Sequence, residues 1–209
     1  MKIAVVAANG QAGQRIVAEA LERGHEVTAV VRGVNKTQTS NVLSKDLFAL
    51  TKEDLAGFDA VVTAFGAFAP ELLPQHETSL THLADLLAGT DTRLLVVGGA
   101  GSLYIDEALT TQLADTSDFP ADYRPLAQAM AAGLAKLRHY QQVKWTYISP
   151  AADFVADGAK TGEYILAGEL FTVNVAGQSQ ISYADYAVAM LDEIESGQHI
   201  QERISVLGR

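Results

Sequence analysis

The sequence predicts a doubly wound α/β fold, in which helices cover both faces of a mostly parallel sheet. Two observations lead to this prediction. Short apolar, β-branched runs alternate with amphipathic runs almost from end to end, as they do in parallel sheets that are covered on both faces. The length of 209 residues, with 48% hydrophobic residues, suffices for one substantial core and is short for two. We therefore expect a single domain over residues 1–209.

The expected elements follow one another along the chain. Apolar runs predict strands at residues 2–6, 26–31, 41–43, 59–64, 93–97 and 145–149. Apolar residues at helical spacing predict helices at residues 14–23, 51–55, 77–87 and 183–194, and a longer one from Pro125 to about Tyr140. Ser182 is the expected N-cap of the last helix. After Pro150 the alternation stops, and residues 151–182 contain only short strand-like pieces.

Composition and charge exclude several classes of function. The chain has no cysteine, so disulfides and thiolate metal sites are ruled out. The formal net charge is -10 and the basic residues are scattered, which disfavours nucleic acid as a partner. No apolar run approaches the roughly 20 residues of a membrane helix, and the first residues lack a signal-peptide layout. We therefore expect a cytoplasmic protein with no membrane partner.

The first strand-to-helix turn carries the clearest chemical signal, in the run Ala7-Ala8-Asn9-Gly10-Gln11-Ala12-Gly13. A dinucleotide pyrophosphate needs a tight turn, a residue without a side chain where the backbone meets phosphate, and a helix N-terminus with free N–H groups. Gly10 and Gly13 supply the last two glycines of this pattern, while Ala7 replaces the first. The position between an expected strand and an expected helix favours dinucleotide binding over a purely structural turn.

Arg32, at the end of the second expected strand, bears on the choice of cofactor. Proteins of this fold that bind NAD place an acidic residue there, which accepts hydrogen bonds from the ribose hydroxyls. A guanidinium instead pairs with a 2′-phosphate, and Lys36 could assist it. The alternative is a solvated arginine at a strand end. We expect NADP(H) as the preferred cofactor, with NAD(H) as the second choice.

Seven segments taken in order resemble the atypical short-chain dehydrogenase/reductases, in particular the NmrA-like and NADH-flavin reductase group with a single NAD(P)-binding domain. They are AANGQAG, VVRG, KDLF, TAFG, LLVVGGAGSLY, WTYISPAADF and ISYADYAVAMLDEIE. The likeness covers nearly the whole chain, and LLVVGGAGSLY is its most diagnostic segment. It implies a seven-stranded Rossmann-like sheet and a small C-terminal substrate lobe in residues 151–182. The family usually has Gly-Ala-Thr-Gly where this chain has Ala7-Ala8-Asn9-Gly10.

The resemblance also implies which residues hold the cofactor. The turn residues would meet the pyrophosphate, Arg32 the adenosine phosphate, and the residues after the other strands the adenine, ribose and nicotinamide. These residues are Asn9, Gly10, Gln11, Ala12, Gly13, Arg32, Asp46, Leu47, Ala64, Phe65, Gly66, Gly98, Gly99, Ala100, Pro150 and Ala151. Each has a plain alternative: Asp46, for example, could be only a turn or cap residue. As a set they follow the carboxyl ends of strands, where open α/β sheets bind ligands.

Catalytic residues are harder to assign. Tyr140 and Lys144 have the spacing of a tyrosine–lysine proton relay, but they lie on either side of a helix end and should not share a face near the nicotinamide. Near the usual position of the tyrosine stands Tyr123, and the residue four further on is Ala127 instead of lysine. Ser102 and Tyr104 follow the central strand, where a hydroxyl could reach a bound acceptor. The alternative for this pair is a loop serine and a packed tyrosine.

These features favour an NAD(P)H-dependent reductase of a small conjugated acceptor such as a flavin or a quinone, because such an acceptor can take its proton from water. The second hypothesis is a redox sensor that binds NADP(H) and acts through a protein partner. A nucleotide-sugar epimerase is disfavoured by the short stretch after Pro150.

No metal is expected, since the five histidines lack ligand spacing and are expected at the surface or at helix caps. Ser102 also lacks the G-x-S-x-G elbow of a hydrolase.

Overall fold

The computed structural model describes all residues, 1–209. Its centre is an eight-stranded sheet in the order β3-β2-β1-β4-β5-β6-β10-β8. The strands are β1 (Lys2–Val6), β2 (Glu26–Val31), β3 (Val42–Ser44), β4 (Ala60–Thr63), β5 (Arg93–Val97), β6 (Lys144–Ser149), β8 (Tyr164–Ala167) and β10 (Glu202–Gly208). All neighbours pair in parallel except β8, which runs antiparallel to β10 at the edge. The predicted doubly wound α/β fold is therefore confirmed.

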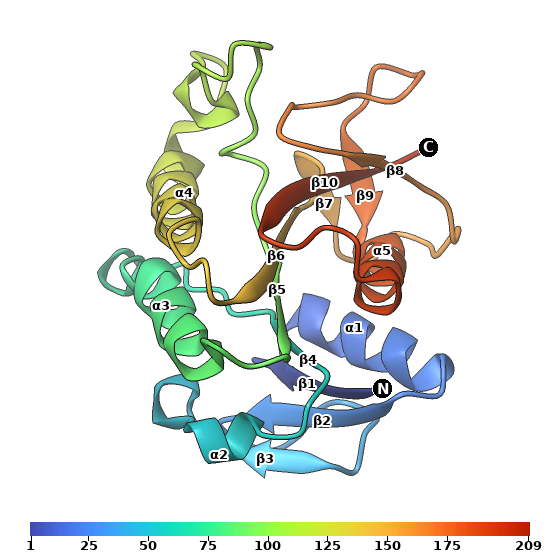
Figure 1. Cartoon of the computed structure of the whole chain (residues 1–209). Coiled ribbons are helices and arrows are strands. Elements are labelled where there is room, and N and C mark those ends of the chain that lie inside the picture. The colour runs from blue at the N-terminus through green and yellow to red at the C-terminus, as the bar shows by residue number, and fades with distance from the viewer.

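Helices cover both faces of this sheet (Figure 1). Their bounds are α1 (Gln11–Glu22), α2 (Lys52–Leu55), α3 (Gln75–Leu87), α4 (Arg124–Leu137) and α5 (Tyr183–Ser196). Short 3-10 helices lie at η1 (Leu47–Ala49), η2 (Pro70–Leu72), η3 (Leu113–Asp115) and η4 (Ala121–Tyr123). In Figure 1, α1 and α5 lie together on one side of the sheet, and α3 and α4 lie together on the other. None of these helices combines the length and the apolar composition needed to cross a bilayer.

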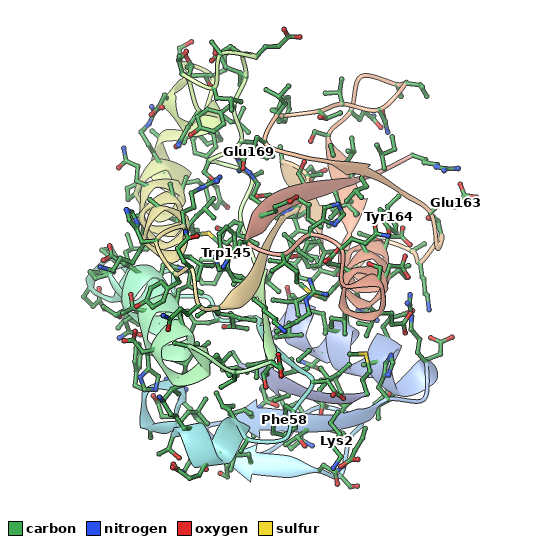
Figure 2. The ribbon with its side chains drawn as sticks, in the orientation of Figure 1. Lys2, Phe58, Trp145, Glu163, Tyr164 and Glu169 are labelled. Atoms are coloured by element: carbon green, nitrogen blue, oxygen red, sulfur yellow. The ribbon has the colours of Figure 1, made fainter.

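Alternation along the strands divides the core into two layers. In β1, Ile3 and Val5 belong to the cluster under α1 and α5, whereas Ala4 and Val6 belong to the cluster under α3 and α4. Every one of these four side chains is buried, as expected for a central parallel strand. Trp145 of β6 belongs to the second cluster and is only 2% exposed; Figure 2 shows it within the molecule.

Local sequence signals fix the helix ends. Ser182 accepts a hydrogen bond from the Asp185 backbone N–H at 2.9 Å and so caps α5 as predicted. Gly197 ends α5 in the left-handed region, with φ at 64°. Pro125 lies in the first turn of α4, where its missing N–H costs nothing.

The C-terminal quarter differs from the expectation of a seven-stranded sheet with a separate lobe. Residues 151–182 supply β7 (Asp153–Val155) and β9 (Gln180–Ser182), which pair in parallel as a small second sheet. The same segment also supplies β8, which joins the main sheet through β10 and makes the eighth strand. The expected count of seven strands is therefore wrong, because part of the lobe continues the central sheet.

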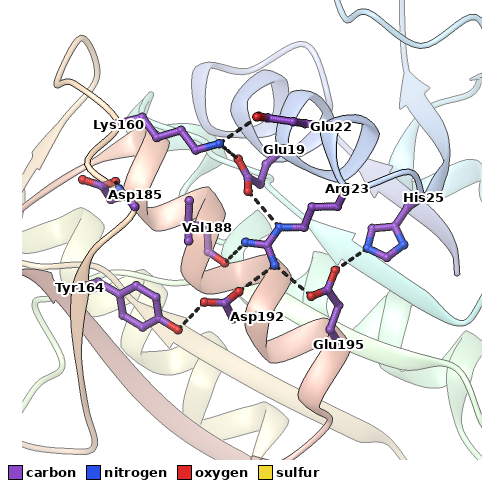
Figure 3. A network of polar contacts seen from close by, with 11 residues as sticks. Glu19, Glu22, Arg23, His25, Lys160, Tyr164, Asp185, Val188, Asp192 and Glu195 are labelled. Atoms are coloured by element: carbon purple, nitrogen blue, oxygen red, sulfur yellow. Dashed lines mark hydrogen bonds and ion pairs between the residues drawn. The ribbon is translucent and has the colours of Figure 1, made fainter.

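A network of ion pairs connects α1 to α5 (Figure 3). The Arg23 guanidinium donates to Glu19 at 2.9 Å, to Asp192 at 2.7 Å and to Glu195 at 3.0 Å. Lys160 Nζ reaches the other oxygen of Glu19 at 2.6 Å and so brings the segment between β7 and β8 into the network. The network thereby ties two helices and a connecting segment that lie far apart in the sequence.

Candidate functional site

A cleft of about 830 Å³ opens at the carboxyl ends of the parallel strands. It is lined by the segments that follow β1, β2, β3, β4, β5 and β6, together with side chains from α3, α4, β7 and α5. The strand order reverses between β1 and β4, because β2 and β3 extend the sheet to one side and β4, β5 and β6 to the other. Open α/β sheets bind ligands at such a reversal, so the cleft lies where the fold provides a binding site.

The turn after β1 forms the floor of the cleft. Ala7 adopts a φ of 59°, and the Gly10 N–H donates to the Ala7 carbonyl at 3.0 Å, which closes the turn. Helix α1 begins directly afterwards, so the N–H groups of its first turn point out of the helix without intrahelical partners. A Cβ atom on Gly13 would lie 2.8 Å from the Ala7 carbonyl oxygen, so only glycine lets α1 approach the strand this closely. The tight turn, the N-terminus of α1 and the close packing at Gly13 are together the features that a pyrophosphate site needs.

Asn9 has a positioning role that sequence reasoning did not foresee. Its Nδ2 donates to the Val34 carbonyl at 2.9 Å, and its Oδ1 accepts from the Lys36 backbone N–H at 2.8 Å. The side chain therefore fixes the loop after β2 to the turn after β1. Asn9 lines the cleft as expected, but with an amide group that is already hydrogen-bonded within the protein.

The far end of the cleft, beside β2 and β3, carries the charged lining residues. The Arg32 side chain is 80% exposed and its Nη1 lies 3.9 Å from Asp46 Oδ2, a distance that leaves most of its donors free. Asp46 itself accepts from the Phe48 backbone N–H at 2.9 Å and caps η1, and it lines the cleft as expected. Lys45 Nζ is held by Asp54 at 2.6 Å. Arg32 is thus the more exposed of the two cations at this end, and no hydrogen bond within the protein occupies its guanidinium.

Glycines line the opposite end of the cleft, after β5. A Cβ atom on Gly98 would come within 2.2 Å of the Tyr147 ring, and one on Gly99 within 2.9 Å of Met130 Sδ. Burial raises the pKa of Tyr147 to about 12, so this phenol stays protonated at neutral pH. Pro150 and Ala151 follow β6 and line the same end. The remaining expected cofactor residues that line the cleft are Gly10, Gln11, Ala12, Leu47, Ala64, Phe65, Gly66 and Ala100.

Six further side chains that line the cleft were not predicted. They come from the loop after β4 and from α3, α4, β7 and α5, and they are Phe68, Gln75, Leu126, Met130, Phe154 and Tyr183. The rings of Phe154 and Tyr183 pack with centroids 3.9 Å apart. No sequence motif marks these residues, because each is a single side chain that tertiary packing brings to the cleft.

His76 also lies at this end and corrects an expectation. It is only 6% exposed, whereas the histidines were expected at the surface or at caps. Its Nε2 lies 2.9 Å from the Ala67 carbonyl oxygen, and its ring meets the Phe65 ring edge-on at 5.6 Å. Burial lowers its pKa, so the imidazole is neutral at pH 7. We assign His76 the task of holding the loop after β4 in place.

Ser102 and Tyr104, the expected catalytic pair, do not line the cleft. Ser102 is 5% exposed, and its Oγ lies 3.3 Å from Nη1 of Arg203. The Tyr104 ring lies beneath the Arg203 guanidinium, 5.8 Å from its centroid, and the Tyr104 backbone pairs with Glu169 and Phe171. Arg203 Nε also donates to Glu169, labelled in Figure 2, at 2.9 Å. Both residues instead brace the loop after β5 against β10, and neither is placed to touch a ligand in the cleft.

Tyr140 and Lys144 do not form a proton relay, as predicted. The Tyr140 hydroxyl donates to Asp85 at 2.8 Å, and Lys144 Nζ donates to Asp91 at 2.7 Å. Lys144 begins β6, so it lies at the amino end of the sheet, opposite the cleft. Tyr123 is 62% exposed and is not among the lining residues.

The fold and the cleft define a dinucleotide-binding α/β protein. Comparison with known proteins agrees: residues 7–196 match the NAD(P)H-binding family, and the chain belongs to that family. The uncharacterized protein YwnB of Bacillus subtilis is 47% identical over 209 residues, which cover 99% of this chain and 98% of YwnB.

Two solved structures extend the comparison. A crystal structure from Streptococcus pneumoniae named "putative NADH-flavin reductase" superposes with a TM-score of 0.98 at 61% identity and covers 100% of both chains. A protein from Lactobacillus casei superposes with a TM-score of 0.90 at 34% identity, covering 100% of this chain and 99% of its own. The NAD(P)H-binding family and the Rossmann-like fold therefore agree with the resemblance.

Proposed function

We propose that this protein is an NADPH-preferring oxidoreductase that reduces a small conjugated acceptor, such as a flavin or a quinone. The observation that carries the proposal is one continuous cleft with two different ends. One end presents the free guanidinium of Arg32, and the other combines the glycines after β5 with the aromatic rings of Phe154 and Tyr183. The neighbour from Streptococcus pneumoniae, with its reductase name, supports the same class of reaction.

The chain's own residues would bind and orient the reactants. The turn after β1 and the N-terminus of α1 fit the pyrophosphate, and Arg32 fits a 2′-phosphate. When bound, NADPH supplies a hydride, so that NADPH, a proton and an oxidised flavin or quinone give NADP⁺ and the two-electron-reduced acceptor. The lining tyrosine and lysine, Tyr183 and Lys45, lie at opposite ends of the cleft and form no relay, so the proton would come from water. Positioning of the two rings is then the main contribution of the protein.

Titration of the purified protein with NADPH and with NADH, by fluorescence or calorimetry, tests the proposal. Riboflavin, FMN, FAD and a quinone are then added while the nicotinamide absorbance is followed. We expect tighter binding of NADPH than of NADH, and oxidation only when an acceptor is present. Tight binding without oxidation by any acceptor would contradict the reductase proposal and support the alternative, an NADP(H) sensor that acts through a protein partner.

A further inference from the structure

The charged side chains of the cleft gather at one end. Among the lining residues, the charged ones are Arg32, Lys45 and Asp46, which follow β2 and β3. At the other end the titratable groups are His76, whose burial lowers its pKa and keeps it neutral, and the phenol of Tyr183, whose burial raises its pKa. The cleft therefore offers cations to the adenosine half of a dinucleotide only.

The end beside β5 and β6 is built for a flat, uncharged ring. Leu126 and Met130 of α4 line it from one helix, and Phe154 and Tyr183 line it from the C-terminal segments. Phe68, in the loop after β4, also lines the cleft with 77% of its surface exposed, so a large apolar ring is left open to a ligand. Aromatic and thioether side chains favour planar, polarizable partners.

Exposed carboxylates accompany these lining residues in the sequence. Glu71 lies between Phe68 and Gln75, Asp122 lies one helical turn before Leu126, and Asp153 is adjacent to Phe154. All three residues are exposed. The formal net charge of -10 makes the long-range field of the whole chain unfavourable for an anionic ligand.

We propose that the acceptor end of the cleft selects an uncharged planar ring system and makes no contact with a phosphate group. The inference rests on the proposed function and narrows its substrate class to uncharged acceptors. These are riboflavin or a quinone without charged substituents, and the phosphate of FMN should bring no gain in binding. In the reaction, NADPH donates the hydride and water the proton, and NADP⁺ and the reduced neutral acceptor leave.

Riboflavin and FMN form the decisive pair, because they share one ring system and differ by a phosphate. Their dissociation constants are measured by flavin fluorescence quenching with the protein saturated with NADP⁺, and kcat/KM is measured with NADPH. We expect riboflavin to bind and react at least as well as FMN, and FMN to improve as salt screens the carboxylates. FMN binding that is tenfold tighter than riboflavin binding and weakens with salt would overturn the proposal, because it would reveal a cation at the phosphate.

Substitution of Gln75 tests the charge distribution directly. Gln75 is the one amide side chain at this end and begins α3, so its replacement leaves the helix interior intact. We expect Gln75→Lys to improve FMN binding relative to riboflavin by about fivefold, and Gln75→Met, of similar length, to leave that ratio unchanged. An unchanged ratio in both variants would contradict the proposal.

The binding measurement separates this inference from the proposed function. If no acceptor oxidises NADPH but riboflavin binds at least as tightly as FMN, the proposed reductase function is wrong and the neutral ring site stands. If flavins and quinones turn over but FMN is strongly preferred, the function stands and the inference is wrong. If riboflavin and menadione both fail to bind, the proposed site for an uncharged ring is wrong, whether or not the protein oxidises NADPH.

Discussion

Ala7 adopts a backbone conformation that glycine would adopt at less cost. Its φ of 59° lies in the left-handed region, where an L-residue with a side chain is disfavoured by about 1–2 kcal/mol. The turn needs this conformation, because the Ala7 carbonyl accepts from Gly10 and lies against Gly13. Ala7 therefore introduces backbone strain in the turn after β1, which lines the cleft.

Ala7→Gly should release this strain. Allowing for the greater freedom of glycine in the unfolded chain, we expect a gain of about 1 kcal/mol in the free energy of unfolding, measured by urea denaturation. Ala18→Gly, inside α1, is the matched control and should lose about the same amount, since a helix interior disfavours glycine. A lower free energy of unfolding in Ala7→Gly would contradict the prediction that glycine relieves backbone strain in this turn.

Arg32 can be tested at the same scale. Arg32→Asp replaces a free guanidinium with a carboxylate that would accept from ribose hydroxyls and repel a 2′-phosphate. We expect NADPH to bind at least tenfold more weakly and NADH to change much less, as measured by fluorescence titration. Arg15→Asp, exposed on α1 and absent from the cleft lining, makes the same charge change elsewhere. Equal losses for both cofactors in Arg32→Asp would refute its phosphate role.

At the scale of elements, the loop after β5 is joined to β10 through the buried Arg203. Ser102→Ala removes one hydrogen bond of this junction and should cost about 1 kcal/mol of stability. Because the hydroxyl faces Arg203 and not the cleft, we expect kcat/KM with riboflavin to stay within about twofold of the wild type. Ser117→Ala, exposed in the following loop, serves as the control. A hundredfold fall in kcat with stability unchanged would restore Ser102 as a catalytic residue.

The helices and strands that could be predicted from the sequence are those whose ends are marked by residues close to them in the chain. The strand Glu26–Val31 matches its expected bounds, because its apolar run and flanking residues mark both ends. The last strand, β10, was missed because Arg203 and Ser205 interrupt its apolar pattern. Both polar side chains can be buried because residues of the segment before β9 accept their hydrogen bonds. Glu169 accepts from Arg203, and the Gly168 carbonyl accepts from Ser205. These partners lie 34 and 37 residues away in the sequence, so a pattern of neighbouring residues cannot reveal them.

The same distinction separates the two halves of the cleft. Residues such as Gly10, Arg32 and Gly98 directly follow strands or begin a helix, so their place at the carboxyl edge of the sheet could be predicted. Met130 and Phe154 come from the middle of α4 and from β7, and only the packing of those elements brings them to the cleft. The burial of Ser102 away from the cleft could not be predicted for the same reason, because its partner Arg203 lies 101 residues further on.

For the whole molecule, the ion-pair network around Arg23 holds the N-terminal half against the C-terminal segments (Figure 3). Three carboxylates surround one guanidinium that is 20% exposed, so the attraction is screened less than in a surface pair. Tyr164 adds a bond to Asp192 at 2.8 Å; burial, followed by this bond, raises its pKa to about 12. The network thus couples α1, α5 and β8.

Arg23→Met should therefore destabilise the whole domain. It keeps the aliphatic stem but leaves Asp192 and Glu195 close together without their cation, and we expect a loss of about 1 kcal/mol or more in low salt. The loss should shrink in 0.5 M salt, since screening weakens the repulsion that remains. Lys144→Met is the control: its partner Asp91 is fully exposed, so we expect no measurable change. Equal effects of the two substitutions, or a loss in Arg23→Met that is independent of salt, would show that packing of the stem and not charge joins the two halves.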